Sequence, residues 1–191
     1  MLSRKYKGSF GNLIRPLSLK LHQSGVTAAQ VTLAGLLFSV AAGLAYWKGN
    51  FTGGGIFLLL AGMSDAIDGT VARASGEVTP FGAFIDSVAD RYSEFFVFGG
   101  LALYYAGSPV LLLVLLSLAG SMMVSYSRAK AESVIGRCDV GLMERPERLI
   151  LLMVGSLFHL MLPALWLLAI LSNMTALHRI HHTWKSVKGT E

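Results

Sequence analysis

Residues 65–90, DAIDGTVARASGEVTPFGAFIDSVAD, place four aspartates in a chain that is otherwise strongly apolar. Hydrophobic residues make up 53% of the 191 residues and charged residues only 14%, whereas a soluble domain is nearer a quarter charged. The mean hydropathy is +0.58. This composition indicates an integral membrane protein, in which carboxylates are costly unless they are paired, hydrated or bound to metal.

Apolar runs on both sides of this stretch predict six membrane-spanning helices, each near the roughly 20 residues that a bilayer crossing needs. We expect them at about residues 31–47, 53–74, 82–105, 109–129, 148–162 and 164–182. In residues 8–22 the apolar side chains recur at helical spacing, which predicts a helix that lies on the membrane surface. The predicted fold is an all-α integral membrane protein with six transmembrane helices after an N-terminal amphipathic surface helix. Its expected parts are a juxtamembrane arm (1–30), a six-helix membrane domain (31–183) and a short cytoplasmic tail (184–191).

Lysine and arginine gather in the N-terminal arm, after the second and fourth predicted spans and in the C-terminal tail, while the alternate loops carry only Lys48. An even number of spans with both termini in the cytoplasm satisfies this pattern. The sequence therefore predicts a multi-pass protein of the cell (inner) membrane with the aspartates at its cytoplasmic side. The net charge of +5 favours membrane lipids and phosphorylated substrates as partners, and not nucleic acid.

The four aspartates form two pairs at helical spacing. Asp65 and Asp68 are three residues apart, and Asp86 and Asp90 are four apart, so each pair shares a helix face. Turn-forming residues, ASGEVTPFG, separate the pairs. Two antiparallel helices would therefore bring four carboxylates together near one membrane depth.

Four neighbouring carboxylates repel one another, and the nearby arginines are too few to neutralise them. Oxygen-only ligands suit Mg²⁺ or Mn²⁺ better than zinc, and four carboxylates suffice for two ions. Two such ions form the usual clamp for phosphoryl chemistry. A structural ion-pair network is the alternative interpretation of the same residues.

The stretch also fits the pattern D-x(2)-D-G-x(2)-A-R-x(8)-G-x(3)-D-x(3)-D at every specified position. These positions are Asp65, Asp68, Gly69, Ala72, Arg73, Gly82, Asp86 and Asp90. The pattern resembles the signature of the CDP-alcohol phosphotransferases. The resemblance implies an enzyme of phospholipid biosynthesis: an acceptor hydroxyl attacks the lipid-bearing phosphorus of a CDP-linked lipid such as CDP-diacylglycerol, and CMP leaves.

The resemblance also implies roles for individual residues. Asp65, Asp68 and Asp86 would bind the metal, and Asp90 would act as general base, often with metal contact too. The expected CDP-lipid contacts are Gly69, Ala72, Arg73 and Thr79, with Ala29, Gln30, Val31 and Thr32 upstream. Relatives of this kind imply a homodimer.

A second stretch, residues 125–152, SYSRAKAESVIGRCDVGLMERPERLILL, suggests the acceptor. Its basic residues Arg128, Lys130, Arg145 and Arg148 can bind a phosphate, or can reflect only cytoplasmic topology and anionic lipid binding. SYSRAKAE followed by ERPERL resembles the inositol-phosphate branch of the family, which implies an inositol phosphate acceptor. Glycerol 3-phosphate is the alternative, because it too would use a basic pocket.

Two further interpretations are weaker. A cation transporter would distribute its carboxylates across the membrane depth, whereas this sequence clusters them at one boundary. His178, His181 and His182 have a spacing that permits metal binding, but their basic and aromatic neighbours favour an interfacial end to the last span.

Overall fold

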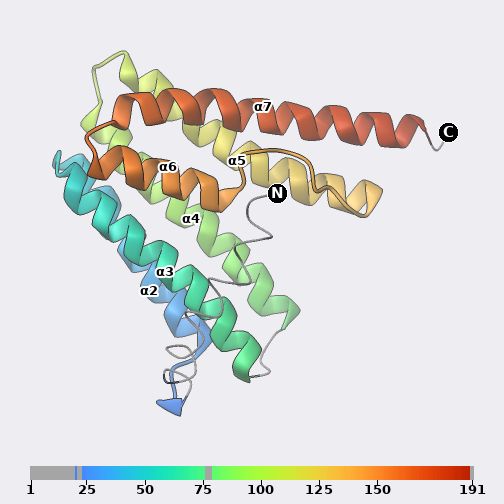
Figure 1. Cartoon of the computed structure of the whole chain (residues 1–191), viewed down its shortest axis with the longest axis horizontal. Coiled ribbons are helices and arrows are strands. Elements are labelled where there is room, and N and C mark those ends of the chain that lie inside the picture. Colours follow the sequence, from blue (N-terminus) through green and yellow to red (C-terminus); the bar gives the residue numbers. More distant parts are fainter. Residues whose placement is uncertain (1–19, 21–22, 76–78, 190–191) are drawn as a thin grey trace. The chain divides into compact units, whose positions relative to one another are not determined.

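The structure is a computed structural model that describes residues 20, 23–75 and 79–189. Within these residues the chain is helical and contains no strand (Figure 1). The helices are α2 (Ala28–Trp47), α3 (Phe51–Ser75), α4 (Pro80–Tyr104), α5 (Val110–Ile135), α6 (Arg145–Leu157) and α7 (Met161–Lys188). The all-α prediction is confirmed, and each predicted span lies mainly in one helix, although the fifth (148–162) extends into the start of α7. The predicted surface helix at residues 8–22 lies, apart from Lys20, outside the described residues.

Four of these helices, α2, α3, α5 and α7, are long and apolar enough to cross a membrane. They carry exposed large side chains such as Leu112, Trp166 and Ile170, as expected of surfaces that face lipid. Helix α4 does not meet the same criterion because it carries several charges, and α6 has only 13 residues. The chain is therefore a multi-pass membrane protein, and six spans remain a prediction.

The chain divides into two compact units between Gly100 and Leu101, and each is described by itself. In the first unit, α2 and α3 lie side by side (Figure 1). A tight turn connects them, in which Gly49 has the positive φ of 75° that glycine adopts most readily. The side chain of Asn50 then accepts a hydrogen bond of 2.9 Å from the backbone N–H of Gly53 and caps α3.

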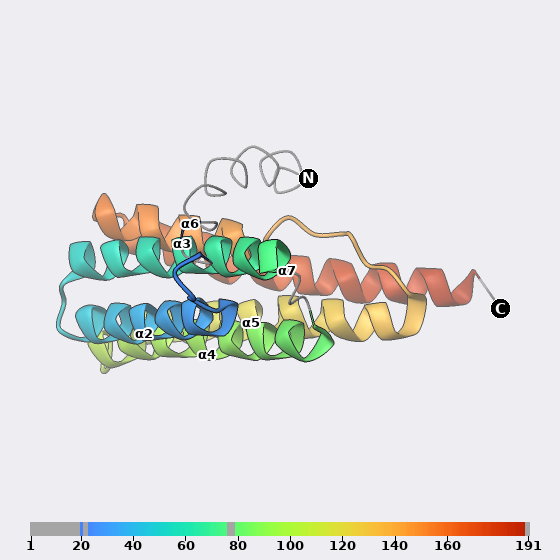
Figure 2. The ribbon, with the colours of Figure 1, turned by 90° about the horizontal axis from the view of Figure 1, so that it is seen from below.

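Helices α2 and α4 approach each other closely at two glycines. A Cβ atom built on Gly100 would lie 2.0 Å from the carbonyl oxygen of Gly43, and one on Gly43 would lie 2.3 Å from that of Phe96. Figure 2 shows the two helices running alongside each other. Small residues at such crossings let membrane helices pack backbone to backbone.

Replacing Gly100 by alanine should therefore destabilise the first unit, because the added methyl group meets backbone that cannot move aside. We expect a loss of about 1–3 kcal/mol in the free energy of unfolding, measured in detergent. Gly99→Ala is the matched control, since nothing lies within 4 Å of the Cβ atom it would add. Equal stability of the two variants would show that α2 and α4 do not pack in this way.

In the second unit, α7 packs against both α5 and α6. Polar side chains link α5 and α7: Ser117 Oγ donates to the carbonyl of Leu165 at 3.1 Å, and Asn173 Nδ2 donates to that of Leu116 at 3.1 Å. Such interhelical hydrogen bonds are typical of membrane helix pairs. Helix α5 ends at Ile135 and is followed by the C-cap residue Gly136, whose φ is 75°.

Candidate active site

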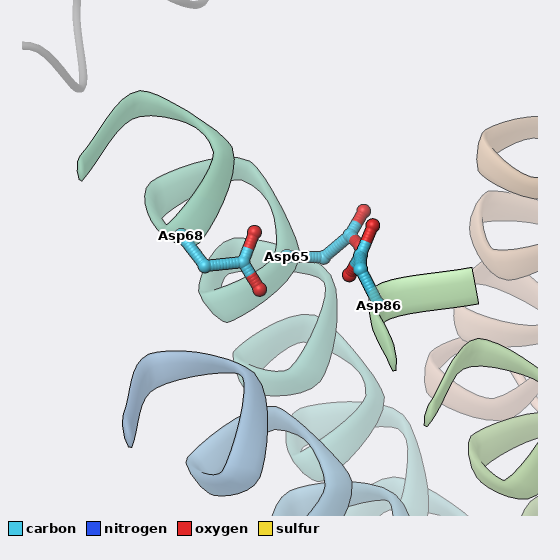
Figure 3. A group of neighbouring side chains, drawn as sticks. All are labelled: Asp65, Asp68 and Asp86. Atoms are coloured by element: carbon cyan, nitrogen blue, oxygen red, sulfur yellow. The ribbon is translucent and has the colours of Figure 1, made fainter. Parts of the chain in front are cut away.

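Three of the four aspartates meet in the first unit. One carboxylate oxygen from each of Asp65, Asp68 and Asp86 lies within 4.8 Å of the others. Figure 3 shows Asp65 and Asp68 extending from α3, with Asp86 reaching them from α4. We call these three residues the aspartate group. The sequence expectation that two helices bring carboxylates together holds for these residues.

Local sequence explains how the two helices present these side chains. Asp65 and Asp68 lie within one turn of α3 and so share a face. Helix α4 starts at Pro80, a residue suited to a first helical turn, and the hydroxyl of Thr79 accepts a hydrogen bond of 3.0 Å from the N–H of Gly82. This start places Asp86 in the second turn of α4, beside α3.

Asp68 is the buried member of the aspartate group, with 6% of its surface exposed, while Asp65 and Asp86 are half-buried. The hydroxyl of Thr32, on α2, donates a hydrogen bond of 2.8 Å to Asp68 Oδ2. A buried carboxylate needs such partners, because leaving one without them is costly. The group therefore draws on three helices of the first unit.

Asp90 lies one helical turn beyond Asp86 on α4 and is not a member of the aspartate group. Its Oδ2 atom is 3.5 Å from Arg91 Nη2, and Arg91 Nη1 is 4.0 Å from a carboxylate oxygen of Glu94. Asp90 thus lies beside a cation, and its expected role as general base remains a prediction.

The aspartate group fits a hard divalent cation. All three donors are carboxylate oxygens, which Mg²⁺ and Mn²⁺ prefer. The three oxygens all lie within 4.8 Å of one another, close enough for one ion to draw them together as ligands.

The N-terminal end of α2 contains the four upstream residues expected to contact a CDP-lipid. Gln30 forms a capping box with Thr27, in which each side chain accepts a hydrogen bond from the other's backbone N–H. Val31 is buried and packs with Ile67 and Val71 of α3. Ala29 is exposed and Thr32 is half-buried. Gln30 and Val31 therefore also have structural roles that fix this helix end.

The remaining expected CDP-lipid contacts lie near the aspartates in sequence. Gly69 and Ala72 are half-buried on α3, and Thr79 is exposed at the start of α4. Arg73 belongs to α3, but its side chain lies outside the described part of the chain.

The second unit contains the basic residues expected to bind the acceptor. Arg128 lies among three carboxylates: its Nε is 2.9 Å from Glu132, its Nη1 3.4 Å from Glu144 and its Nη2 3.8 Å from Asp139. Lys130 is exposed. Arg128 is therefore not a bare cation but the centre of a charged network.

Two buried arginines accompany Arg128. Arg148 is 2% exposed and donates from Nη1 to the carbonyl of Met143 at 3.1 Å. Arg179, also 2% exposed, donates from Nε to the carbonyl of Val140 at 2.8 Å. It lies close enough to Arg128 and Arg148 for their positive charges to repel its own. Arg145 is half-buried at the start of α6. The structure thus groups Arg128, Arg148 and Arg179.

The sequence interpretation did not single out Arg179, which it treated only as one of the basic residues near the C-terminus. The available signal was its place inside the last predicted span, residues 164–182. An ionisable residue within a membrane helix is by default a hypothesis for a functional site.

The C-terminal histidines form no metal-binding group of three within the described residues. The rings of His181 and Trp184 lie 5.7 Å apart, and Lys188 Nζ is 4.5 Å from the centre of the Trp184 ring. An interfacial end to α7 remains the prediction for this region.

Residues 25–180 match the CDP-alcohol phosphatidyltransferase family, and the chain belongs to that family of enzymes. An archaetidylinositol phosphate synthase of Pyrococcus horikoshii is 38% identical over 165 residues, which cover 86% of this chain and 87% of the relative. A phosphatidylinositol phosphate synthase of Mycobacteroides abscessus is 36% identical over 193 residues, 95% of this chain and 86% of the relative.

Solved structures agree with this membership. The crystal structure of Mycobacterium tuberculosis phosphatidylinositol phosphate synthase with CDP-DAG bound has a TM-score of 0.82 at 33% identity and covers 91% of this chain and 94% of that one. The same enzyme in complex with manganese and citrate has a TM-score of 0.81 at 34% identity, over 88% of each chain.

Proposed function

We propose that this enzyme transfers a lipid-bearing phosphoryl group from a CDP-linked lipid to a hydroxyl of inositol phosphate and releases CMP. The observation that carries the proposal is the meeting of Asp65, Asp68 and Asp86 from two helices in a chain of this family. The names of its relatives, phosphatidylinositol phosphate and archaetidylinositol phosphate synthases, favour inositol phosphate over glycerol 3-phosphate as the acceptor.

In this reaction a bond forms between the acceptor oxygen and the phosphorus that carries the lipid, and the bond from that phosphorus to the CMP oxygen breaks. Asp90 accepts the proton of the acceptor hydroxyl. Asp65, Asp68 and Asp86 hold divalent metal, which we take to be two Mg²⁺ or Mn²⁺ ions with Asp90 contributing to one. When bound, such ions neutralise the diphosphate and stabilise negative charge on the departing CMP.

The nucleotide and diphosphate bind along the first unit, near Gly69, Ala72, Arg73 and Thr79 and the start of α2 with Ala29, Gln30, Val31 and Thr32. The acceptor phosphate binds to Arg128, Lys130, Arg145 and Arg148, to which we add Arg179. Guanidinium groups suit this task because they donate two parallel hydrogen bonds to a phosphate. The carboxylates around Arg128 hold its side chain in one place before substrate arrives.

The distribution of lysine and arginine supports six spans in residues 31–183, with the arm (1–30), the tail (184–191) and the active site in the cytoplasm. In that arrangement the lipid tails stay in the bilayer while the nucleotide remains in water. We also propose that the enzyme works as a homodimer.

A CMP-release assay with purified enzyme, a CDP-linked lipid and Mn²⁺ tests the acceptor directly. We expect release with inositol phosphate and little with glycerol 3-phosphate at the same concentration. Preference for glycerol 3-phosphate would overturn the acceptor assignment. Manganese flux into liposomes without CMP release would instead favour a transporter.

Arg148→Lys should raise the KM for inositol phosphate about tenfold and leave the KM for the CDP-lipid unchanged. Lysine keeps the positive charge and fills most of the buried space that the arginine side chain occupies. It cannot form the two parallel hydrogen bonds that a guanidinium group donates to a phosphate. Arg137→Lys is the control, because Arg137 is 69% exposed and lies in the neighbouring loop. An equal rise in both KM values for Arg148→Lys would contradict a role in acceptor binding.

A further inference from the structure

The hydroxyl of Thr32 connects α2 to the aspartate group. It lies 2.8 Å from Asp68 Oδ2, across 36 residues of sequence, and 3.1 Å from the carbonyl oxygen of Ala28 in its own helix. Asp68 is the most deeply buried of the three aspartates.

We propose that Thr32 is a positioning residue, which holds the Asp68 carboxylate in the orientation that binds the divalent ion. This inference rests on the proposed function, because it takes Asp68 to be a metal ligand. For Thr32 this role takes the place of the direct contact with the CDP-lipid that the family resemblance implies.

The chemistry of the hydroxyl indicates that Thr32 donates its proton to Asp68. A threonine hydroxyl has one proton and so donates to one acceptor at a time. The carboxylate is the nearer acceptor, and a hydrogen bond to an ionised group is roughly twice as strong as one between neutral groups. The carbonyl of Ala28, one turn earlier and 3.1 Å away, is the competing acceptor within α2.

The geometry leaves the carboxylate able to bind metal. An ionised carboxylate has about four lone-pair sites on two oxygens, so a single donor on Oδ2 leaves Oδ1 for the ion. Partners that hold a metal ligand from behind fix its orientation, and their loss costs about 10–100-fold in metal affinity or activity.

The test measures Mn²⁺ affinity of the whole chain in detergent, without CDP-lipid, from the electron paramagnetic resonance signal of free Mn²⁺. Thr32→Val removes the hydroxyl at nearly constant shape, and we expect its Kd for Mn²⁺ to rise about tenfold. Thr32→Ser keeps the hydroxyl and should restore the affinity to within about threefold of the original enzyme, whereas a purely structural role for the methyl group would not permit this rescue.

Thr183→Val is the matched control, because Thr183 makes the same bond to a carbonyl one turn earlier, that of Arg179, but in the second unit. It should leave the Mn²⁺ affinity unchanged. If Thr32→Val does not fold, Thr32→Ala removes the same hydroxyl with a smaller side chain and serves in its place.

The outcomes separate this inference from the function on which it rests. An unchanged Mn²⁺ Kd in Thr32→Val, with a raised KM for the CDP-lipid at every Mn²⁺ concentration, would overturn positioning in favour of direct lipid contact and leave the transferase intact. A raised Kd for Mn²⁺ in Thr32→Val, together with a normal KM for the CDP-lipid at saturating Mn²⁺, supports the positioning role. Absence of Mn²⁺ binding in the original enzyme would overturn both.

Discussion

Asp68→Asn is expected to lower CMP release by more than about 100-fold and to weaken Mn²⁺ binding in parallel. Losing a residue that only orients a metal ligand costs about 10–100-fold, so losing a charged ligand itself should cost more. The change is nearly isosteric, and the hydroxyl of Thr32 can still donate to the amide oxygen, so the helices should remain folded. Both quantities are measured on protein that elutes as a single species from size exclusion.

Asp139→Asn is the matched control for this prediction, since it makes the same chemical change in the second unit, in the loop between α5 and α6. Its effect should be confined to the acceptor KM, because Asp139 lies 3.8 Å from Arg128. Normal Mn²⁺ affinity in Asp68→Asn would show that this carboxylate does not bind the ion.

The second large effect is expected at Asp90. Asp90→Asn removes the proposed general base, which accounts for about 10²–10⁴-fold in rate, while the aspartate group stays complete. The variant should therefore retain the Mn²⁺ ion that the aspartate group holds, retain binding of the CDP-lipid and lose turnover. Binding is measured by calorimetry and turnover by CMP release.

A different pattern would reassign Asp90. If Asp90→Asn weakens Mn²⁺ binding as much as Asp68→Asn does, Asp90 is chiefly a ligand. If turnover is unchanged, another group accepts the proton.

Most of the fold could be predicted from sequence because membrane helices depend on long apolar runs, which local composition records directly. The ends of the helices were less predictable. Helix α5 continues to Ile135 and α7 to Lys188, beyond the predicted ends at residues 129 and 182, because charged residues such as lysine and glutamate are also good helix formers. No hydropathy pattern marks where such an extension stops.

The aspartate group could be predicted because its residues are close in sequence and their spacing fixes a shared helix face. Contacts between distant segments could not. The bond from Thr32 to Asp68 depends on how α2 packs against α3. The approach of Asp139 and Glu144 to Arg128 depends on the path of the loop between α5 and α6. Arg179 was missed because burial in a membrane helix depends on the neighbouring helices as well as on the local sequence.

The central claim is that aspartates from two neighbouring helices hold divalent metal, and anomalous X-ray scattering at the manganese edge tests it most directly. Crystals grown with Mn²⁺ and a CDP-linked lipid should show an anomalous peak among the carboxylates of Asp65, Asp68 and Asp86. Manganese bound elsewhere, with these three side chains pointing apart, would contradict the account.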